Sequence, residues 1–261
     1  MRWDLFLILM ILPWLATFGG SLLAARISIK TQSRQNALLG FAAGVMVAAS
    51  VWSLIIPAFE GMKKDFRSAL VVTLGFALGV GGMLLLDKIV PHQHLDEDVP
   101  EGSPSHLTRP MLLVLAVALH NIPEGLALGV VIAAAMQDAG MTWTAAMFGL
   151  GLALQNFPEG MAVVLPLRQA GRGRGRCIWW GFWASLAEPA AAIAGLLLTS
   201  ALSLLGGVVM PVLLSVAAGA MVFIVVEELI PESQSGDHGH GPTYGFLLGF
   251  WSMALMGIIG G

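Results

Sequence analysis

The chain has 261 residues, of which 57% are hydrophobic and 11% are charged, and its formal net charge is −3. Soluble domains carry about 25% charged residues, so this composition indicates a membrane protein and excludes an ordinary soluble domain. A single cysteine, Cys177, excludes an intramolecular disulfide and any metal site built from several cysteines.

Eight apolar runs are long enough to cross a membrane, since a bilayer core about 30 Å thick needs about 20 apolar residues per helix. They cover residues 4–25, 36–59, 68–90, 110–136, 142–167, 177–203, 208–231 and 243–261. We therefore expect an all-α polytopic membrane protein with eight transmembrane helices, helix 1 to helix 8, in a single domain, 1–261. Asp4 and the length of the first run favour a retained helix over a cleaved signal peptide.

Basic residues predict the orientation, because cytoplasmic connections carry an excess of Lys and Arg. With the N-terminus outside, the inner side holds nine basic residues and the outer side four. Most of the inner charge comes from "RQAGRGRGR" (168–176), which we interpret as a solvated cytoplasmic loop rather than a nucleic-acid site. The polar segment 91–109 between helices 3 and 4 is predicted to be a cytoplasmic loop on the same side. Both termini are therefore expected on the outer side of the membrane, opposite the cytoplasm.

An internal repeat links the two ends of the chain. "AAGVMVAASVWSLIIP" (42–57) resembles "AAGAMVFIVVEELIP" (217–231), which has one residue fewer, and "TLGFALG" (73–79) resembles "TYGFLLG" (243–249). Helices 2 and 3 thus match helices 7 and 8, and helices 2 and 7 cross in opposite senses. We expect an inverted repeat of helices 1–3 and 6–8 around helices 4 and 5, an arrangement common in secondary transporters.

Helices 4 and 5 carry two nearly identical polar hexamers, "HNIPEG" and "QNFPEG". Their polar side chains are His120, Asn121, Glu124, Gln155, Asn156 and Glu159. On each helix the first residue and the glutamate four positions later share one face, and the asparagine lies about 100° round the helix. Pro123 and Pro158 each free a backbone carbonyl and bend the helix at this level. Gly125 and Gly160 permit a neighbouring helix to approach closely.

A third carboxylate, Glu188, lies beside a proline in the otherwise apolar helix 6. Three glutamates buried together repel one another and are costly to desolvate, so they need protons or a cation. Imidazole, amide and carboxylate groups suit Zn(II), Fe(II) and Mn(II). The seven residues therefore predict a divalent metal site between helices 4, 5 and 6. The alternative is a polar contact between helices with a buried core histidine.

Further polar residues suggest an exit and an entrance for the cation. The candidate exit residues on the inner side are Asp87, His92, His94, Glu227, Glu228, His238 and His240. The candidate entrance residues at the outer end of helix 2 are Ser53 and Glu60, which are seven apart and are therefore expected on one helix face. The alternatives are ordinary loop solvation for the histidines and a plain helix-end charge for Glu60.

Taken together, HNIPEG, QNFPEG, "SLAEP" (185–189) and "EELIPES" (227–233) make the chain resemble the ZIP (Zrt/Irt-like protein) family of divalent-metal transporters, in its bacterial GufA-like branch. The resemblance covers nearly the whole chain. It implies uptake of Zn(II) into the cytoplasm, with Cd(II), Fe(II) and Mn(II) as further candidates, across a bacterial cytoplasmic (inner) membrane. It also implies a homodimer and a motion of helices 1, 4, 5 and 6 against the other four.

The resemblance further implies a two-metal centre. The residues that match its first metal position are His120, Glu124, Gln155, Glu159 and Glu188. Asn121 and Asn156 match the second position, which shares the three glutamates. Family members often have His where this chain has Gln155, and some have Asp at Asn156, so the amides here bear on metal preference.

An intramembrane metal-dependent hydrolase is the alternative function, because it would also place His and Glu at helical spacing. The chain has no HExxH motif, and its ligand-type residues come in duplicate, which suits passage of an ion better than hydrolysis. A metal sensor is a third hypothesis, although eight spans favour transport. The sequence therefore predicts no enzyme and no catalytic cofactor.

Overall fold

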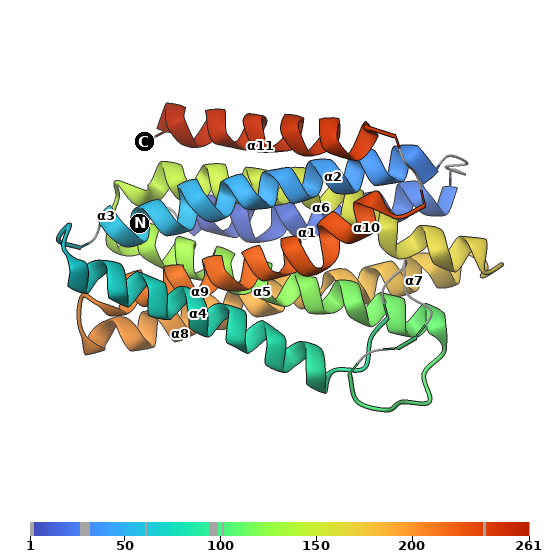
Figure 1. Cartoon of the computed structure of the whole chain (residues 1–261), viewed down its shortest axis with the longest axis horizontal. Coiled ribbons are helices and arrows are strands. Elements are labelled where there is room, and N and C mark those ends of the chain that lie inside the picture. The colour runs from blue at the N-terminus through green and yellow to red at the C-terminus, as the bar shows by residue number, and fades with distance from the viewer. Residues whose placement is uncertain are drawn as a thin grey trace.

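The structure is a computed structural model that describes residues 3–26, 32–60, 62–93, 99–100, 102–236 and 239–260. They form a bundle whose helices run along the long axis of the molecule (Figure 1). The helices are α1 (Trp3–Arg26), α2 (Gln32–Ala49), η1 (Ser50–Ile55), α3 (Ile56–Glu60), α4 (Phe66–Ile89), α5 (Arg109–Gln137), α6 (Met141–Gln169), α7 (Arg174–Ser185), α8 (Ala187–Leu202), η2 (Ser203–Leu205), α9 (Val209–Ile224), η3 (Val225–Leu229), α10 (Ile230–Gln234) and α11 (Gly241–Gly260).

The predicted all-helical membrane fold is confirmed. Seven segments of the described residues are long and apolar enough to cross a membrane. The remaining predicted span is α6, which has 29 residues and the required length. It falls short of the apolar composition of the other spans because Gln155, Asn156 and Glu159 lie in its middle. The least apolar span is thus one that carries a predicted ligand set.

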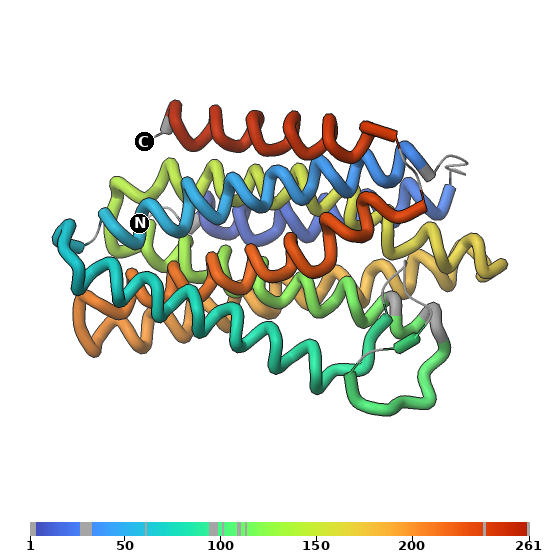
Figure 2. The backbone as a smooth tube through the Cα atoms, in the orientation of Figure 1, coloured from blue at the N-terminus to red at the C-terminus, as the bar shows by residue number. Residues whose placement is uncertain are grey.

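Both chain ends lie at the same end of the bundle, which we call the termini end (Figure 1). The opposite end, which we call the loop end, carries residues 102–108 and the turn between α6 and α7 (Figure 2). At the termini end Asp65 caps α4, because the Ser68 amide donates a hydrogen bond of 2.9 Å to its Oδ1. This hydrogen bond lowers the pKa of the Asp65 carboxyl.

Helices 2 and 7 of the prediction each contain a π-helical segment at the same place in the repeat. The segments, η1 and η3, end just before Pro57 and Pro231. A proline clashes with the carbonyl four residues earlier, and widening the helix to a π-turn relieves that clash. The first segment has six residues and the second has five. The extra residue of the first repeat is therefore accommodated in its longer π segment.

The glycine contacts show that the repeat is structural. A Cβ atom on Gly44 would collide with the carbonyl oxygen of Phe246, and one on Gly219 would collide with that of Phe76. Gly44 matches Gly219 and Phe76 matches Phe246 in the two repeats. The pair α2–α11 is thus built like the pair α9–α4. Because α2 and α9 run in opposite directions, the repeat is inverted as predicted (Figure 1).

The central helices α5 and α6 are each held by a glycine of their hexamer. A Cβ atom on Gly125 would collide with the Glu188 carbonyl of α8, and one on Gly160 with the Thr17 carbonyl of α1. The predicted close approach is confirmed at both glycines. Each helix also continues through the proline of its hexamer without ending there. The interruption in this part of the bundle occurs at Leu186, between α7 and α8.

Candidate metal centre

The seven side chains predicted for the metal site are all buried in the middle of the bundle. α5 provides His120, Asn121 and Glu124, α6 provides Gln155, Asn156 and Glu159, and α8 provides Glu188. The most exposed of them, His120, has 5% of its surface accessible. Glu188 reaches this level because α8 starts at Ala187, directly after the break, and Pro189 fits its first turn, where no amide hydrogen is needed.

Amide side chains connect the three helices. Gln155 Nε2 donates to Glu124 Oε1 at 2.8 Å, and Asn156 Nδ2 donates to Glu188 Oε2 at 2.7 Å. Asn121 Nδ2 donates to the Ala184 carbonyl of α7 at 3.1 Å. Each amide nitrogen therefore has an acceptor. These hydrogen bonds fix α5, α6 and α8 relative to one another. They use the amide nitrogens and leave the three amide oxygens without a donor.

Seven buried oxygen atoms of these residues have no hydrogen-bond partner. They are Asn121 Oδ1, Glu124 Oε2, Gln155 Oε1, Asn156 Oδ1, both carboxylate oxygens of Glu159, and Glu188 Oε1. All are acceptors, and a buried acceptor without a donor costs on the order of 1–3 kcal/mol, more when charged. Such a group of atoms is satisfied by a cation, which accepts lone pairs from several oxygens at once.

The carboxylates lie close enough together to repel one another. Glu124, Glu159 and Glu188 are all buried in the same layer of the bundle, where like charges withdrawn from water repel one another strongly. No Lys or Arg faces them within the described residues of the spans, and amides are their main hydrogen-bond donors. The geometry therefore favours a divalent cation over a neutral ligand.

His120 contacts a partner outside the predicted set. Its Nε2 pairs with Glu228 Oε2 of η3 rather than with a glutamate of the hexamers. Across the described residues, no three His, Cys, Asp or Glu side chains gather into one ready-made metal group. Such a group does not form because His120 pairs with Glu228, and because Gln155 and Asn156 each bond one of the carboxylates. The donor set is thus mostly oxygen, with one imidazole at its edge.

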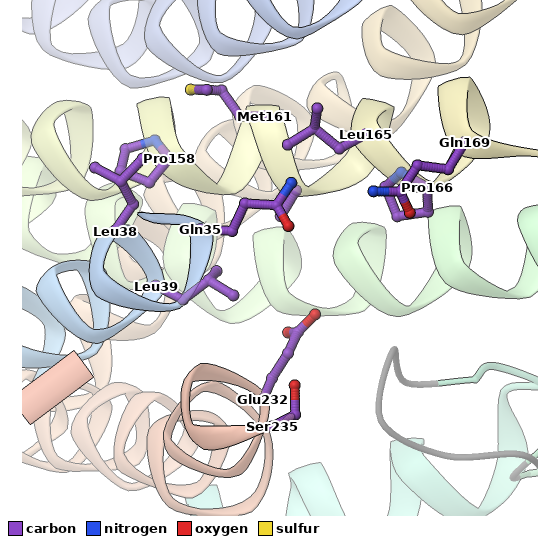
Figure 3. Close-up of a pocket in the computed structure, with 11 residues that line it drawn as sticks. Gln35, Leu38, Leu39, Pro158, Met161, Leu165, Pro166, Gln169, Glu232 and Ser235 are labelled. Atoms are coloured by element: carbon purple, nitrogen blue, oxygen red, sulfur yellow. The ribbon is translucent and has the colours of Figure 1, made fainter. Parts of the chain in front are cut away.

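A route leads from the centre to the loop end. A narrow cavity of about 30 Å³ is lined by His120, Glu159, Glu232 and Gln93. It shares Glu232 and several apolar residues with a larger cavity of about 170 Å³. The larger cavity lies between α2, α6 and α10, and the Glu232 carboxylate points into it (Figure 3). Gln35, Gln169 and Ser235 complete its polar lining.

The termini end of the bundle has a separate cleft of about 260 Å³ lined by Glu60, Gln137 and Asp138. Fully buried apolar side chains, among them Leu54 and Ile132, belong to the core between this cleft and the centre. The centre is therefore connected to the loop end and separated from the termini end in this conformation.

The predicted exit residues do not form one group. Glu228 joins His120, whereas Asp87 pairs with His92 at 3.1 Å near the end of α4. Glu227 is exposed, and His240 is exposed and lies against Tyr244. His94 and His238 lie outside the described residues.

The predicted entrance residues are also separated. Ser53 is buried in η1, while Glu60 is exposed in the cleft at the termini end. Ser53 lies within the π segment η1, whereas Glu60 is the last residue of α3. Gln137 and Asp138 share the cleft with Glu60, and neither carried a motif that sequence reasoning could have used.

On the loop side, the quoted motif EELIPES contains Glu232, but no motif in the sequence marks Gln93, Gln35 or Gln169. Their common feature is a polar side chain within a few residues of a helix end. That feature is too frequent in membrane proteins to predict a cavity. The structure is needed to bring these three residues to one route.

Comparison with known proteins agrees with the motifs. A family model described as ZIP Zinc transporter matches residues 91–257, more than half of the chain. The zinc transporter ZIPB of Bordetella bronchiseptica is 37% identical over 245 residues, covering 92% of this chain and 76% of that protein. The zinc transporter ZupT of Shigella dysenteriae is 36% identical over 261 residues, covering 96% and 94%.

The zinc transporter GufA of Myxococcus xanthus is 32% identical over 248 residues, covering 94% of each chain. These three matches cover 92–96% of the chain, and the family model spans both hexamers. The chain belongs to the ZIP family of divalent-metal transporters.

Proposed function

We propose that this chain carries Zn(II) across a bacterial cytoplasmic membrane into the cell, with Cd(II), Fe(II) and Mn(II) as further cargoes. The observation that carries the proposal is the group of seven unpartnered oxygen atoms buried between α5, α6 and α8. A cation satisfies them, and the adjoining cavities offer it a way out. The relatives named above are zinc transporters by name, which supports zinc as the main cargo.

The proposed centre holds up to two ions. The first position uses Glu124, Glu159, Glu188, the Gln155 oxygen and His120. The second uses the oxygens of Asn121 and Asn156 together with the shared glutamates. The unpartnered Oδ1 atoms of both asparagines support the second position. Amide oxygens bind a metal more weakly than imidazole or carboxylate, so we expect the second ion to be held less tightly.

The proposed exit runs from Glu159 past His120, Glu228 and Glu232 to the loop end. His120 would bind the ion in the centre, and its present contact with Glu228 supports a role for Glu228 as the next carboxylate on the route. Asp87, Glu227 and the loop histidines His92, His94, His238 and His240 would collect ions beyond the mouth. Glu60 would attract ions at the other end, and Ser53 would line the way between Glu60 and the centre.

The proposed orientation of the chain in the membrane rests on charge. Eight basic residues of the described chain lie at or near the loop end, and three lie at the termini end. The loop-end residues are Arg26, Arg34, Lys88, Arg109, Arg168, Arg172, Arg174 and Arg176. The positive-inside rule makes the loop end cytoplasmic and places both termini outside. A homodimer is part of the proposal, and its mass in detergent would test it.

An intramembrane hydrolase is not favoured. Catalytic zinc sites need a coordination position open to water beside a general base. The centre here offers duplicated amide and carboxylate oxygens, and it belongs to a family of transporters.

Purified protein in liposomes that enclose a zinc-sensitive dye tests the function. We expect the dye signal to rise when Zn(II) is added outside, and to rise faster than in protein-free liposomes. Ionophore added at the end calibrates the maximum signal. A protein that inserts fully, binds Zn(II) and still gives no influx under a gradient would exclude transport.

A further inference from the structure

The loop end of α7 combines exposed positive charge with exposed aromatic rings. Arg174, Arg176, Trp179 and Trp183 form what we call the Arg–Trp face. Both arginines are exposed, and the tryptophans have 57% and 50% of their surfaces accessible. Arg176, Trp179 and Trp183 have spacings of three and four and follow one side of the helix, whereas Arg174 lies in the same first turn, about 160° round the helix from Arg176.

The two guanidinium groups are available to an external partner. Within the described part of the chain, the side chain of neither Arg174 nor Arg176 makes a hydrogen bond or an ion pair. Arg168 differs, because its Nη1 donates to the Arg172 carbonyl at 2.9 Å. Gly173 and Gly175 have open space where a side chain would stand, so a bulky anion can approach the backbone between the arginines.

The aromatic part of the face is held in place by its neighbours. The Trp179 and Trp183 rings pack edge to face with their centroids 5.5 Å apart. The Trp183 ring also packs edge to face on Phe182, with a centroid distance of 5.8 Å. Phe182 in turn packs on Trp14 and Phe18 of α1. Tryptophan rings prefer the level of the lipid headgroups and the first part of the acyl chains. The face therefore lies where a charged headgroup meets hydrocarbon.

We propose that the Arg–Trp face binds an anionic phospholipid of the cytoplasmic leaflet, with its phosphate on Arg174 and Arg176 and its chains along Trp179 and Trp183. Charge complementarity selects this partner, since two unpaired guanidinium groups favour a phosphate and the rings favour acyl chains. The first-turn amides of α7 have no side-chain cap and add donors on the same turn. An ordinary positive-inside loop needs only the charge and not the rings.

The position of α7 gives such a lipid a structural consequence. The far end of α7 is bonded to the centre, because Asn121 donates to the Ala184 carbonyl. The chain then turns at Leu186 and presents Glu188. A lipid on the Arg–Trp face therefore binds the N-terminal end of α7, and the C-terminal end of the same helix contacts the proposed metal ligand Asn121.

Quenching of tryptophan fluorescence by brominated lipids tests the proposal without measuring transport. The protein is reconstituted in phosphatidylcholine vesicles that contain a minor fraction of either brominated phosphatidylglycerol or brominated phosphatidylcholine. We expect stronger quenching by the anionic lipid, and the R174Q/R176Q variant should lose this difference. A preference of about five-fold per arginine, and about thirty-fold for the pair, follows from the attraction of one arginine to an anionic surface.

Three comparison variants make the result specific. W179F/W183F should remove the part of the signal that depends on phosphatidylglycerol, whereas R174K/R176K should keep the preference because it keeps the charge. K63Q/K64Q removes two exposed charges at the termini end and should leave the preference intact. Equal quenching by both lipids in the wild type, or an unchanged preference in a folded R174Q/R176Q protein, would overturn the proposal.

Discussion

The two π segments differ in chemistry although the repeat gives them the same place and shape. η1 carries the neutral Ser53 and is packed among apolar side chains, whereas η3 carries Glu228, which pairs with His120. The cavity route opens on the η3 side, and buried core separates the centre from the cleft near η1. The two repeats therefore share one fold but differ in their polar lining. In this conformation the centre is open on the η3 side and closed on the η1 side.

The strongest test of this comparison removes the centre that both π segments flank. We expect Glu124→Ala or Glu159→Ala to reduce zinc uptake at least about a hundred-fold, since each change deletes a proposed shared ligand. Dye-loaded liposomes measure the rate. Glu227→Ala is the comparison variant, because this glutamate is exposed and lies outside the centre, so its loss should slow uptake far less. Wild-type uptake by a correctly inserted Glu124 or Glu159 variant would show that the proposed centre is wrong.

The second test asks whether the two halves are equivalent in packing. Gly44→Val and Gly219→Val each place a side chain against a backbone carbonyl of the paired helix. We expect each substitution to lower the free energy of unfolding by about 1–3 kcal/mol. The two losses should be similar, because the repeat relates the two contacts. Thermal unfolding in detergent measures this cost. Gly81→Ala, which meets no neighbouring atom, should leave the unfolding temperature the same or higher.

The third test separates the two π segments. Glu228→Gln removes the charge that pairs with His120, and we expect uptake to slow about ten-fold. Ser53→Ala at the matching place in η1 should change the rate much less, since the side chain is small and uncharged. The initial rate of zinc uptake and its dependence on zinc concentration measure both variants. Equal loss in the two variants would mean that the lining is as symmetric as the fold.

Much of the fold could be predicted from the sequence because apolar runs and repeats are local signals. The eight spans, the inverted repeat and the close helix approach at Gly125 and Gly160 all follow from such signals. The candidate ligand residues were also found, because polar groups within an apolar helix are conspicuous. Their burial together in one layer agrees with the spacing of the two hexamers.

The partner of His120 could not be predicted from the sequence. A regular α-helix places residues at about 100° steps, whereas a π-turn takes more residues per turn and rotates the following side chains. That change turns Glu228 towards the centre and leaves Glu227 exposed. The repeat contained a hint, since the two copies differ by one residue just before the proline.

The smallest effect is expected at the loop histidines. His92 is buried and pairs with Asp87, whereas His240 is exposed beside Tyr244, and neither joins the route through Glu232. We expect His92→Ala and His240→Ala, with or without changes at His94 and His238, to alter uptake by no more than about three-fold, because nearby ligands outside the centre adjust affinity modestly. Initial rates at low zinc concentration measure the effect. Complete loss of uptake in the quadruple variant, with intact insertion, would place an obligatory metal site among these histidines at the loop end, outside the route through Glu232.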